Sequence, residues 1–406
     1  MKEFERMNEM KIKKIIMAGI LMSAATALAA VSITDVSAKQ RYPWNGLIDI
    51  TYAIKGDVAS MTRPSMIMTA VDENTGLTYL ASTFLSKPPM TAGTHTVTWN
   101  PIADALHITS DKMRMTISIE DNFPLYCLIN VSGGSSATKY PVTYLDAVPS
   151  GGWTTAHKTN YIVMRWCPAG TYMMQGQRKV TLTKPFYIGI FEVTQKQYKN
   201  VMGSANGFWN MTGDAYPTSA KYAYVRGNMN YPSSTGTTSD SFVGKLKSKT
   251  GLVNIDLPTE AQWEYACRAG TITELSSGKG LTPNNVMEVA GVMNGSIKTD
   301  VVGSHRVNPW GIYDMHGNVP EMCLDYYQDD VGTAAATDPK GPAMGQCRVT
   351  RGMGWDVERS FDSTWPTSVS AYTSTARGFT DGENTGCVSY SSLYWNSPFR
   401  LCMTLQ

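Results

Sequence analysis

The segment LPTEAQWEYACRAG, at residues 257–270, carries the start and stop signals of one short helix. Thr259 is followed three residues later by Gln262, the spacing at which two side chains cap each other's backbone N–H groups. Gly270 readily adopts the left-handed conformation that ends helices. We therefore expect a helix between Thr259 and Gly270, with Cys267 buried inside it as a small hydrophobic side chain.

The same capping pair recurs earlier in the chain, at Thr194 and Gln197, and predicts a second helix there. A third, shorter helix is expected to end at Gly251. Short strands and long loops rich in Gly, Asn and aromatic residues surround these helices. Residues 161–406 are therefore predicted to form one domain of the α+β class.

Residues 39–148 show a different pattern, the alternation of apolar and polar residues that is typical of half-buried strands. The even-numbered residues of 48–54 would line one apolar face, and the odd-numbered residues of 113–119 do the same. Turn signals separate these runs at short intervals, which predicts an all-β sandwich. The segment 92–99 resembles strands of bacterial immunoglobulin-like modules, and the Gly- and Ser-rich residues 149–160 are predicted to be a linker.

The N-terminus has the features of a secretory signal. Lysines at 11–14 precede an apolar run at 15–31, and the small residues of 36–38 form a site that signal peptidases can cut. Residues 27–29 offer an earlier site. The run is short for an uncleaved membrane anchor, and no later stretch reaches transmembrane length. We therefore predict a signal peptide at 1–38 and a mature protein that is secreted, periplasmic or held at the cell surface.

Composition limits the classes of partner. Lys and Arg total 35 against 33 Asp and Glu, so the charge gives no reason to expect binding to nucleic acid. Seven cysteines form no CxxC pair, which argues against a zinc or thioredoxin-like site. An oxidising compartment would allow disulfides, and the odd count leaves at least one thiol over. Neither the pairing nor the oligomeric state follows from the sequence. The cysteines are Cys127, Cys167, Cys267, Cys323, Cys347, Cys387 and Cys402.

Six blocks of residues resemble the formylglycine-generating enzyme, or sulfatase-modifying factor, family and stand in that family's order. They are MRWCPAGTYMM (164–174), PFYIG with EVT (185–194), the helical segment (257–271), WGIYDMHGNVPE (310–321), Arg351-Gly352 and Phe399-Arg400-Leu401. The resemblance covers residues 160–406. It implies a C-type-lectin-like core with much irregular structure.

The family's catalytic cysteines have no counterpart here. In the enzyme, an Arg-Gly-Gly-Ser block is followed by two cysteines that bind copper and oxidise a sulfatase cysteine to formylglycine. Soft thiolates suit Cu(I), which is why that chemistry needs cysteines. Alignment from Arg351 puts Val357 and Asp362 at those positions. This disfavours copper and predicts a protein without the oxidase activity. Five histidines without paired spacing, and the lack of a GxSxG nucleophile elbow, likewise disfavour iron and serine-hydrolase chemistry.

The resemblance also implies a calcium site with a structural role. Its ligands would be the side chains of Asp314 and Glu321 and the backbone carbonyls of Gly317 and Val319. Ca²⁺ prefers such mixed oxygen donors. The alternative is a loop held by hydrogen bonds alone. The residues of the family's other calcium site are missing from the shorter segment 292–302.

The last part of the chain is rich in aromatic residues, which on lectin-like folds form an exposed surface. Such rings can stack on sugars or anchor a protein, although ordinary core packing explains part of them. The candidate ligand-binding residues are Trp355, Asp356, Arg359, Tyr394, Trp395 and Asn396. The leading hypothesis is an exported binding protein with a carbohydrate or protein ligand. The alternatives are an enzyme of altered chemistry in the same cleft, and the formylglycine-generating oxidase itself.

Overall fold

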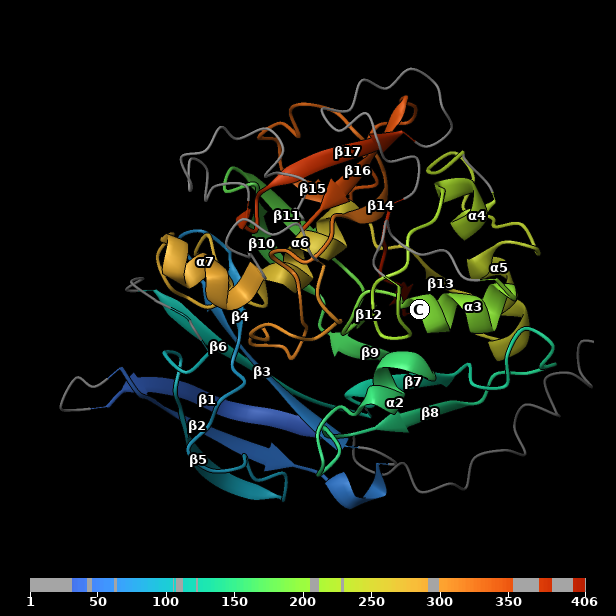
Figure 1. The fold of residues 1–406 in the computed structure, drawn as a ribbon. Coiled ribbons are helices and arrows are strands. Elements are labelled where there is room, and N and C mark those ends of the chain that lie inside the picture. Colours follow the sequence, from blue (N-terminus) through green and yellow to red (C-terminus); the bar gives the residue numbers. More distant parts are fainter. Residues whose placement is uncertain are drawn as a thin grey trace, which may run out of the picture.

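The computed structural model describes residues 31–41, 46–61, 64–104, 106, 112–121, 123–204, 212–227, 230–290, 299–352, 372–381 and 397–405. They form a sheet-rich N-terminal region and a larger mixed region of helices and sheets beside it (Figure 1). Within the described residues, none of the helices has the length and apolar character needed to cross a bilayer.

The described part of the N-terminal region has two antiparallel three-stranded sheets that enclose one core, and a 3-10 helix at Val58–Ser60. The first sheet has the order β1 (Ser32–Gln40), β2 (Ile48–Lys55), β5 (Gly93–Trp99), and the second β4 (Thr78–Leu80), β3 (Pro64–Asp72), β6 (Met113–Asp121). The core contains Ile50 and Tyr52 from β2, Trp99 from β5 and Ile117 from β6. The predicted alternation is confirmed, because each strand turns its apolar residues to the other sheet.

Strand β1 begins inside the segment predicted to be removed as a signal. It pairs with β2 from Ser32, opposite Lys55, to Gln40, opposite Ile48. A cut after Ala38 would remove most of this strand, whereas a cut at residues 27–29 would leave it complete. The signal peptide and its cleavage site stay predictions.

A six-stranded antiparallel sheet forms the centre of the second region. Its order is β13 (Ile255–Asp256), β18 (Cys402–Thr404), β12 (Phe186–Gly189), β9 (Tyr161–Cys167), β7 (Tyr126–Asn130), β8 (Val142–Leu145). Residues 126–145 were expected in the sandwich, but they belong to this sheet. The run Tyr126–Ile129 is buried without alternation, as a strand covered on both faces requires. The predicted linker 149–160 contains a short helix, α2 (Thr155–Thr159).

Among the residues that the structure describes, two smaller sheets and five more helices complete this region. The sheets are β10 (Gly170–Met174), β11 (Arg178–Leu182), β15 (Ala336–Thr337) and β14 (Glu321–Tyr326), β16 (Cys347–Arg351), β17 (Arg377–Asp381). The helices are α3 (Gln195–Met202), α4 (Tyr222–Arg226), α5 (Phe242–Thr250), α6 (Glu260–Arg268) and α7 (Pro283–Ala290).

The three helices predicted from the sequence are present. Thr194 and Thr259 each form a capping box with the glutamine three residues on, at the start of α3 and α6. Helix α5 ends at Gly251, which has a φ of +78°. Ala269 already adopts the left-handed conformation that closes α6, so the helix ends one residue earlier than Gly270 alone would imply.

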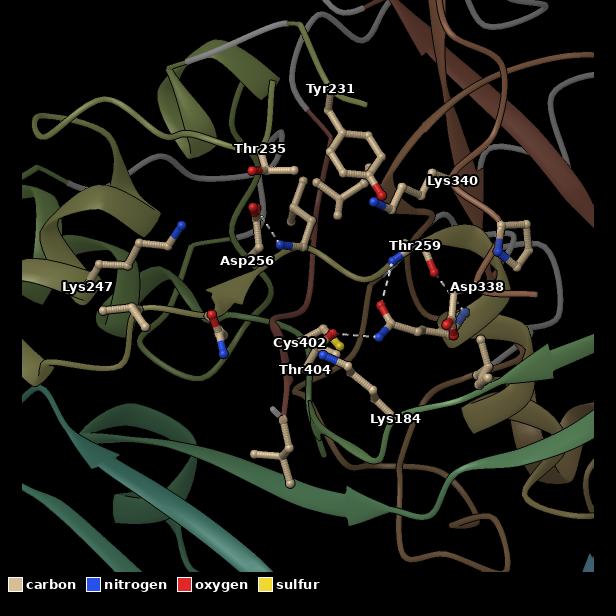
Figure 2. A pocket seen from close by; sticks show the side chains of 18 residues that line it. Lys184, Tyr231, Thr235, Lys247, Asp256, Thr259, Asp338, Lys340, Cys402 and Thr404 are labelled. Carbon is tan, nitrogen blue, oxygen red and sulfur yellow. Dashed lines mark hydrogen bonds between the residues drawn. The ribbon is translucent and has the colours of Figure 1, made fainter. Parts of the chain in front are cut away.

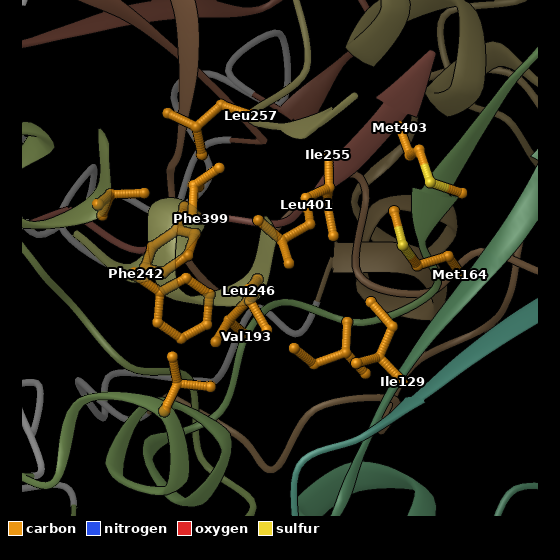
Figure 3. Packing of buried hydrophobic residues seen from close by; sticks show 14 of the residues in the cluster. Ile129, Met164, Val193, Phe242, Leu246, Ile255, Leu257, Phe399, Leu401 and Met403 are labelled. Carbon is orange, nitrogen blue, oxygen red and sulfur yellow. The ribbon is translucent and has the colours of Figure 1, made fainter. Parts of the chain in front are cut away.

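One hydrophobic cluster joins α5 to the central sheet (Figure 3). The ring of Phe242 stacks on that of Tyr198, with centroids 5.4 Å apart, and meets the ring of Phe399 edge-on at 5.3 Å. Helix α6 lies deeper still, because every residue from Glu260 to Arg268 is buried. Its charged side chains therefore need partners inside the protein.

Candidate functional site

Buried ion pairs fasten two strands to helix α6. Arg351, at the end of β16, donates to Glu264 and lies 3.5 Å from Glu260. Arg377, at the start of β17, donates to both oxygens of Glu260. Arg268 lies 2.9 Å from Glu264 within the helix. Because an unpaired buried charge is costly, these pairs fix where β16 ends and β17 begins.

The glycine after Arg351 is required by the packing. Gly352 has a φ of +71°, and a Cβ atom there would lie 2.9 Å from Cζ2 of Trp263. The backbone therefore runs directly against the indole ring of α6. This contact explains why Arg and Gly occur together at this point of the chain.

The six predicted ligand-binding residues, and Val357 and Asp362, lie outside the described residues. The residues that flank them are held in place by the same framework. Arg351 pairs with Arg377, and Cys347 with Asp381, across the β16–β17 ladder. Ser397 forms a backbone bridge to Ala220. The described framework thus fixes the points where the segments 353–371 and 382–396 leave and re-enter it.

Five thiols are free and buried: Cys127, Cys167, Cys267, Cys323 and Cys402. Burial raises the pKa of Cys127, Cys167 and Cys267 to about 12, and the pKa of the other two well above the ordinary value. The burial of Cys267 confirms the prediction made for it. Cys347 is disulfide-bonded, and Cys387 lies outside the described residues. The five buried thiols are therefore protonated near neutral pH.

A buried Cys–His contact was not foreseen from the sequence. The Sγ atom of Cys267 lies 3.8 Å from Nε2 of His316, and Nε2 also accepts a hydrogen bond from the backbone N–H of Ser276 at 3.0 Å. Nδ1 must then carry the proton that it donates to the carbonyl of Tyr372, at 2.7 Å. Burial lowers the pKa of His316 to about 4. A neutral thiol beside a neutral imidazole is not an activated nucleophile, and the contact packs helix α6 against the loop that carries His316.

The predicted calcium ligands divide into two groups. Oδ2 of Asp314 accepts from the N–H of Gly303, while Oδ1 is buried and has no hydrogen-bond partner among the described residues. Both oxygens of Glu321 are instead engaged by Arg400, and one of them also accepts from Trp263 Nε1 at 2.7 Å.

The two backbone ligands of the prediction lie in the turn between these carboxylates. The carbonyl of Gly317 accepts from the N–H of Val319 at 2.9 Å, and Val319 is fully buried. The turn is therefore held by hydrogen bonds, although a carbonyl oxygen has a second lone pair to offer a cation.

Glu192 is a site residue that the sequence argument missed. Its Oε1 accepts from Asn318 Nδ2 at 2.9 Å, and its buried Oε2 has no partner among the described residues. Burial, and then the charge of Asp314, raise the pKa of Glu192 well above its ordinary value; burial also raises the pKa of Asp314. The sequence feature that could have revealed Glu192 is its position in the EVT block (192–194), one of the blocks that resemble the family.

Two facing carboxylates with unsatisfied oxygens suit a hard cation or a shared proton, because ionised carboxylates only accept hydrogen bonds. Lys158 and Arg400 are among the cations close to them, and burial lowers the pKa of Lys158 against the charges of Asp314 and Glu192. No three His, Cys, Asp or Glu side chains gather as a metal site in the described part of the chain. Asp314 and Glu192 are thus the two carboxyl groups that could hold either a cation or a shared proton, whereas Glu321 is committed to Arg400.

Comparisons with known proteins place this framework in a family. A model of the sulfatase-modifying factor enzyme 1-like domain matches residues 150–385. The chain is 28% identical over 252 residues to the chaperone protein LppX of Paenibacillus barcinonensis, covering 53% of this chain and 84% of that protein. It is 37% identical over 108 residues to the formylglycine-generating enzyme of Streptomyces coelicolor, covering 24% of this chain and 34% of the enzyme.

Two further matches are shorter or more distant. The serine/threonine-protein kinase pkn1 of Chlamydia caviae is 40% identical over 102 residues, which span only 16% of the kinase. Treponema denticola variable protein 1, a solved structure, matches with a TM-score of 0.44 at 22% identity, over 60% of this chain and 96% of that chain. The family model covers more than half of the 406 residues. The chain therefore belongs to the sulfatase-modifying factor enzyme 1-like domain family.

Proposed function

We propose that this protein is an exported binding protein that has the family's framework without its oxidase chemistry. Its ligand, a protein or a carbohydrate, would be bound by the segments 353–371 and 382–396. We also propose that the second region has a C-type-lectin-like core and that the N-terminal region is an immunoglobulin-like sandwich, as the sequence implies.

The state of the cysteines is the observation that carries the proposal. Copper-dependent oxidation of a cysteine requires two thiolates that can reach the metal. Five of the seven cysteines are buried thiols with raised pKa values, and Cys347 is in a disulfide. Only Cys387 lies outside the described residues. A copper-binding pair of cysteines would therefore need at least one of the five buried thiols or the disulfide-bonded Cys347. This inventory supports a non-catalytic role.

The framework around β16 and β17 supports a binding role. Ligand-binding segments are commonly loops held by a rigid scaffold, and here the flanking residues are fixed by buried ion pairs and a β-ladder. The name of the Paenibacillus relative, a chaperone, favours a protein ligand over a carbohydrate. Within the proposal, Trp355 and Trp395 are the anchoring side chains.

The activity test uses the chain from residue 31 onward, supplied with Cu(I) and a peptide that carries the sulfatase cysteine motif. We expect no formylglycine by mass spectrometry, while an active formylglycine-generating enzyme converts the same peptide. Turnover by this chain would overturn the proposal.

The binding test measures suppression of the aggregation of reduced insulin, and binding to an array of immobilised glycans. The double variant Trp355→Ala/Trp395→Ala is expected to lose at least roughly tenfold in apparent affinity, as for the loss of aromatic anchors. The control is Tyr224→Ala, which removes an exposed aromatic ring on α4. A wild-type signal in the insulin assay identifies a protein ligand, and one on the array a carbohydrate. Equal effects of the two variants, or no signal in either assay, would count against the proposed surface.

A structural calcium ion held by Asp314 and Glu192 is the second part of the proposal. Ca²⁺ is expected to raise the midpoint of thermal unfolding by roughly 5 °C at about 100 times its dissociation constant. Asp314→Asn and Glu192→Gln should each remove this rise, because each replaces a carboxylate ligand. Glu73→Gln is the control, since that carboxylate pairs with Arg114 in the N-terminal region. Equal calcium effects on wild type and the two ligand variants would show that no ion binds there.

A further inference from the structure

A cavity of about 500 Å³ lies outside all the sites described above (Figure 2). Strands β13 and β18 line one side, and the first residues of α6 line another. The loop after β15 and the segment 231–235 complete the wall. Buried Leu257, Leu324 and Leu405 give it an apolar floor.

Three lysines from separate parts of the chain enter this cavity: Lys184 before β12, Lys247 on α5 and Lys340 after β15. We call it the lysine cavity. Among the described residues, none of these three ammonium groups has an ion-pair or hydrogen-bond partner, although several other lysines do. Burial lowers the pKa of Lys247, against the charge of Asp256.

The acidic residues of the cavity do not balance these charges. Asp256 is already neutralised, because Arg226 binds its two oxygens at 2.7 and 2.8 Å. Asp338 accepts hydrogen bonds from the backbone N–H and the hydroxyl of Thr183, and among the described residues it has no cationic partner. Three lysines thus face one uncompensated carboxylate, and the wall has an excess of positive charge.

Hydroxyl groups lie between the lysines. Oγ1 of Thr259 accepts from the N–H of Gln262 at 3.1 Å, and Oγ1 of Thr404 accepts from Gln262 Nε2 at 2.8 Å. Each hydroxyl keeps its own proton to donate to a ligand. Both oxygens are fixed by Gln262, which itself forms the capping box of α6, so these donors are held in place before a ligand arrives.

We propose that the lysine cavity binds a small molecule that carries phosphate or sulfate groups. Gathering several like charges without a counter-ion is unfavourable, and an anion of two or more charges relieves it. Lysine and hydroxyl groups are common donors to tetrahedral oxyanions. The volume is that of a small-molecule site, and the leucine floor can cover an uncharged part of the ligand.

The test uses tripolyphosphate, inorganic phosphate and sulfate as probes, added at constant ionic strength to the chain from residue 31 onward. Affinity is measured by calorimetric titration and by the shift in the midpoint of thermal unfolding. We expect binding of at least one probe, and a loss of roughly three- to tenfold in affinity for each of Lys184→Gln, Lys247→Gln and Lys340→Gln. The triple variant should not bind measurably.

Two further variants separate this site from a general charge effect. Lys245→Gln removes a charge from α5 at a residue that does not line the cavity, and it should leave the affinity unchanged. Asp338→Asn removes the remaining negative charge and should raise the affinity roughly threefold. Asparagine tolerates the φ of +43° found at this residue.

The outcomes are distinct. Tighter binding of the two phosphate probes assigns phosphate chemistry, and tighter binding of sulfate assigns sulfate chemistry. Binding that the triple variant retains, or that Lys245→Gln weakens equally, would overturn the proposal. So would the absence of binding by every probe. None of these results depends on the proposed ligand surface, because the lysine cavity shares no residue with it.

Discussion

Replacing Arg400 by methionine is expected to lower the free energy of unfolding by about 3–5 kcal/mol, the cost of breaking a buried ion pair from one side. Arg400 is fully buried and is the partner of Glu321. Its charge also lowers the pKa of Glu192 and of Asp314, against the effect of burial. The variant would therefore leave three buried carboxyl groups without their arginine. Urea unfolding followed by tryptophan fluorescence, in a chelating buffer, measures the loss.

A second variant shows whether the charge or the volume of Arg400 matters. In Arg400→Met/Glu321→Gln the uncompensated carboxylate is removed, while the amide can still accept from Trp263. We expect it to regain about half of the lost stability, because removing both partners of a buried pair is far less costly than removing one. If the two substitutions were simply additive, the electrostatic explanation would be wrong.

Replacing Gly317 by alanine is expected to cost about 3 kcal/mol or to prevent folding, because the new methyl group has no space. A Cβ atom there would lie 1.8 Å from the carbonyl oxygen of Ala290 and 2.6 Å from its carbon, at the end of α7. These are backbone atoms, so no side chain can move aside. The next residue, Asn318, donates its N–H to the same oxygen at 3.1 Å. The loop and the helix would have to separate.

Gly280→Ala is the matched control for this substitution. Gly280 also lies in a loop, but a Cβ atom there has no neighbour within 4 Å, and the residue is not in the left-handed region. Its unfolding free energy should stay within about 0.5 kcal/mol of wild type. Both variants are compared by urea unfolding and by thermal midpoint. Similar losses in the two would show that the contact with Ala290 does not limit stability.

Local signals predicted the parts of the fold that depend on neighbouring residues. The capping boxes at Thr194 and Thr259 lie within a few residues of sequence, so both helices were found. The boundary between regions was misplaced, because the Gly-rich segments after Ser132 resemble a linker while Tyr126–Ile129 pairs with β9 across the sheet. Helix α7 has no capping pair of this kind and was not predicted.

Sites formed by residues that lie far apart in the sequence could be predicted only in part. Asp314 was found through its block, but its neighbour Glu192 belongs to another block far earlier in the chain. No spacing links the two. The same holds for the lysine cavity, where Lys184, Lys247 and Lys340 share neither an element nor a period. The numbers of basic and acidic residues in the whole chain are nearly equal, so they did not indicate this local excess of positive charge.

The position of β18 has a consequence for the order of folding. This strand, only residues 402–404, lies between β12 and β13, and Arg400 just before it carries the charge that Glu321 needs. A nascent chain that has made everything up to β17 can already pair β8, β7, β9 and β12, but it lacks the strand that joins β13 to them. Contacts between such distant parts of a chain form slowly. The edge strand β13 and the buried carboxylate of Glu321 are therefore expected to find their partners only in a late step, when residues 400–404 reach the sheet.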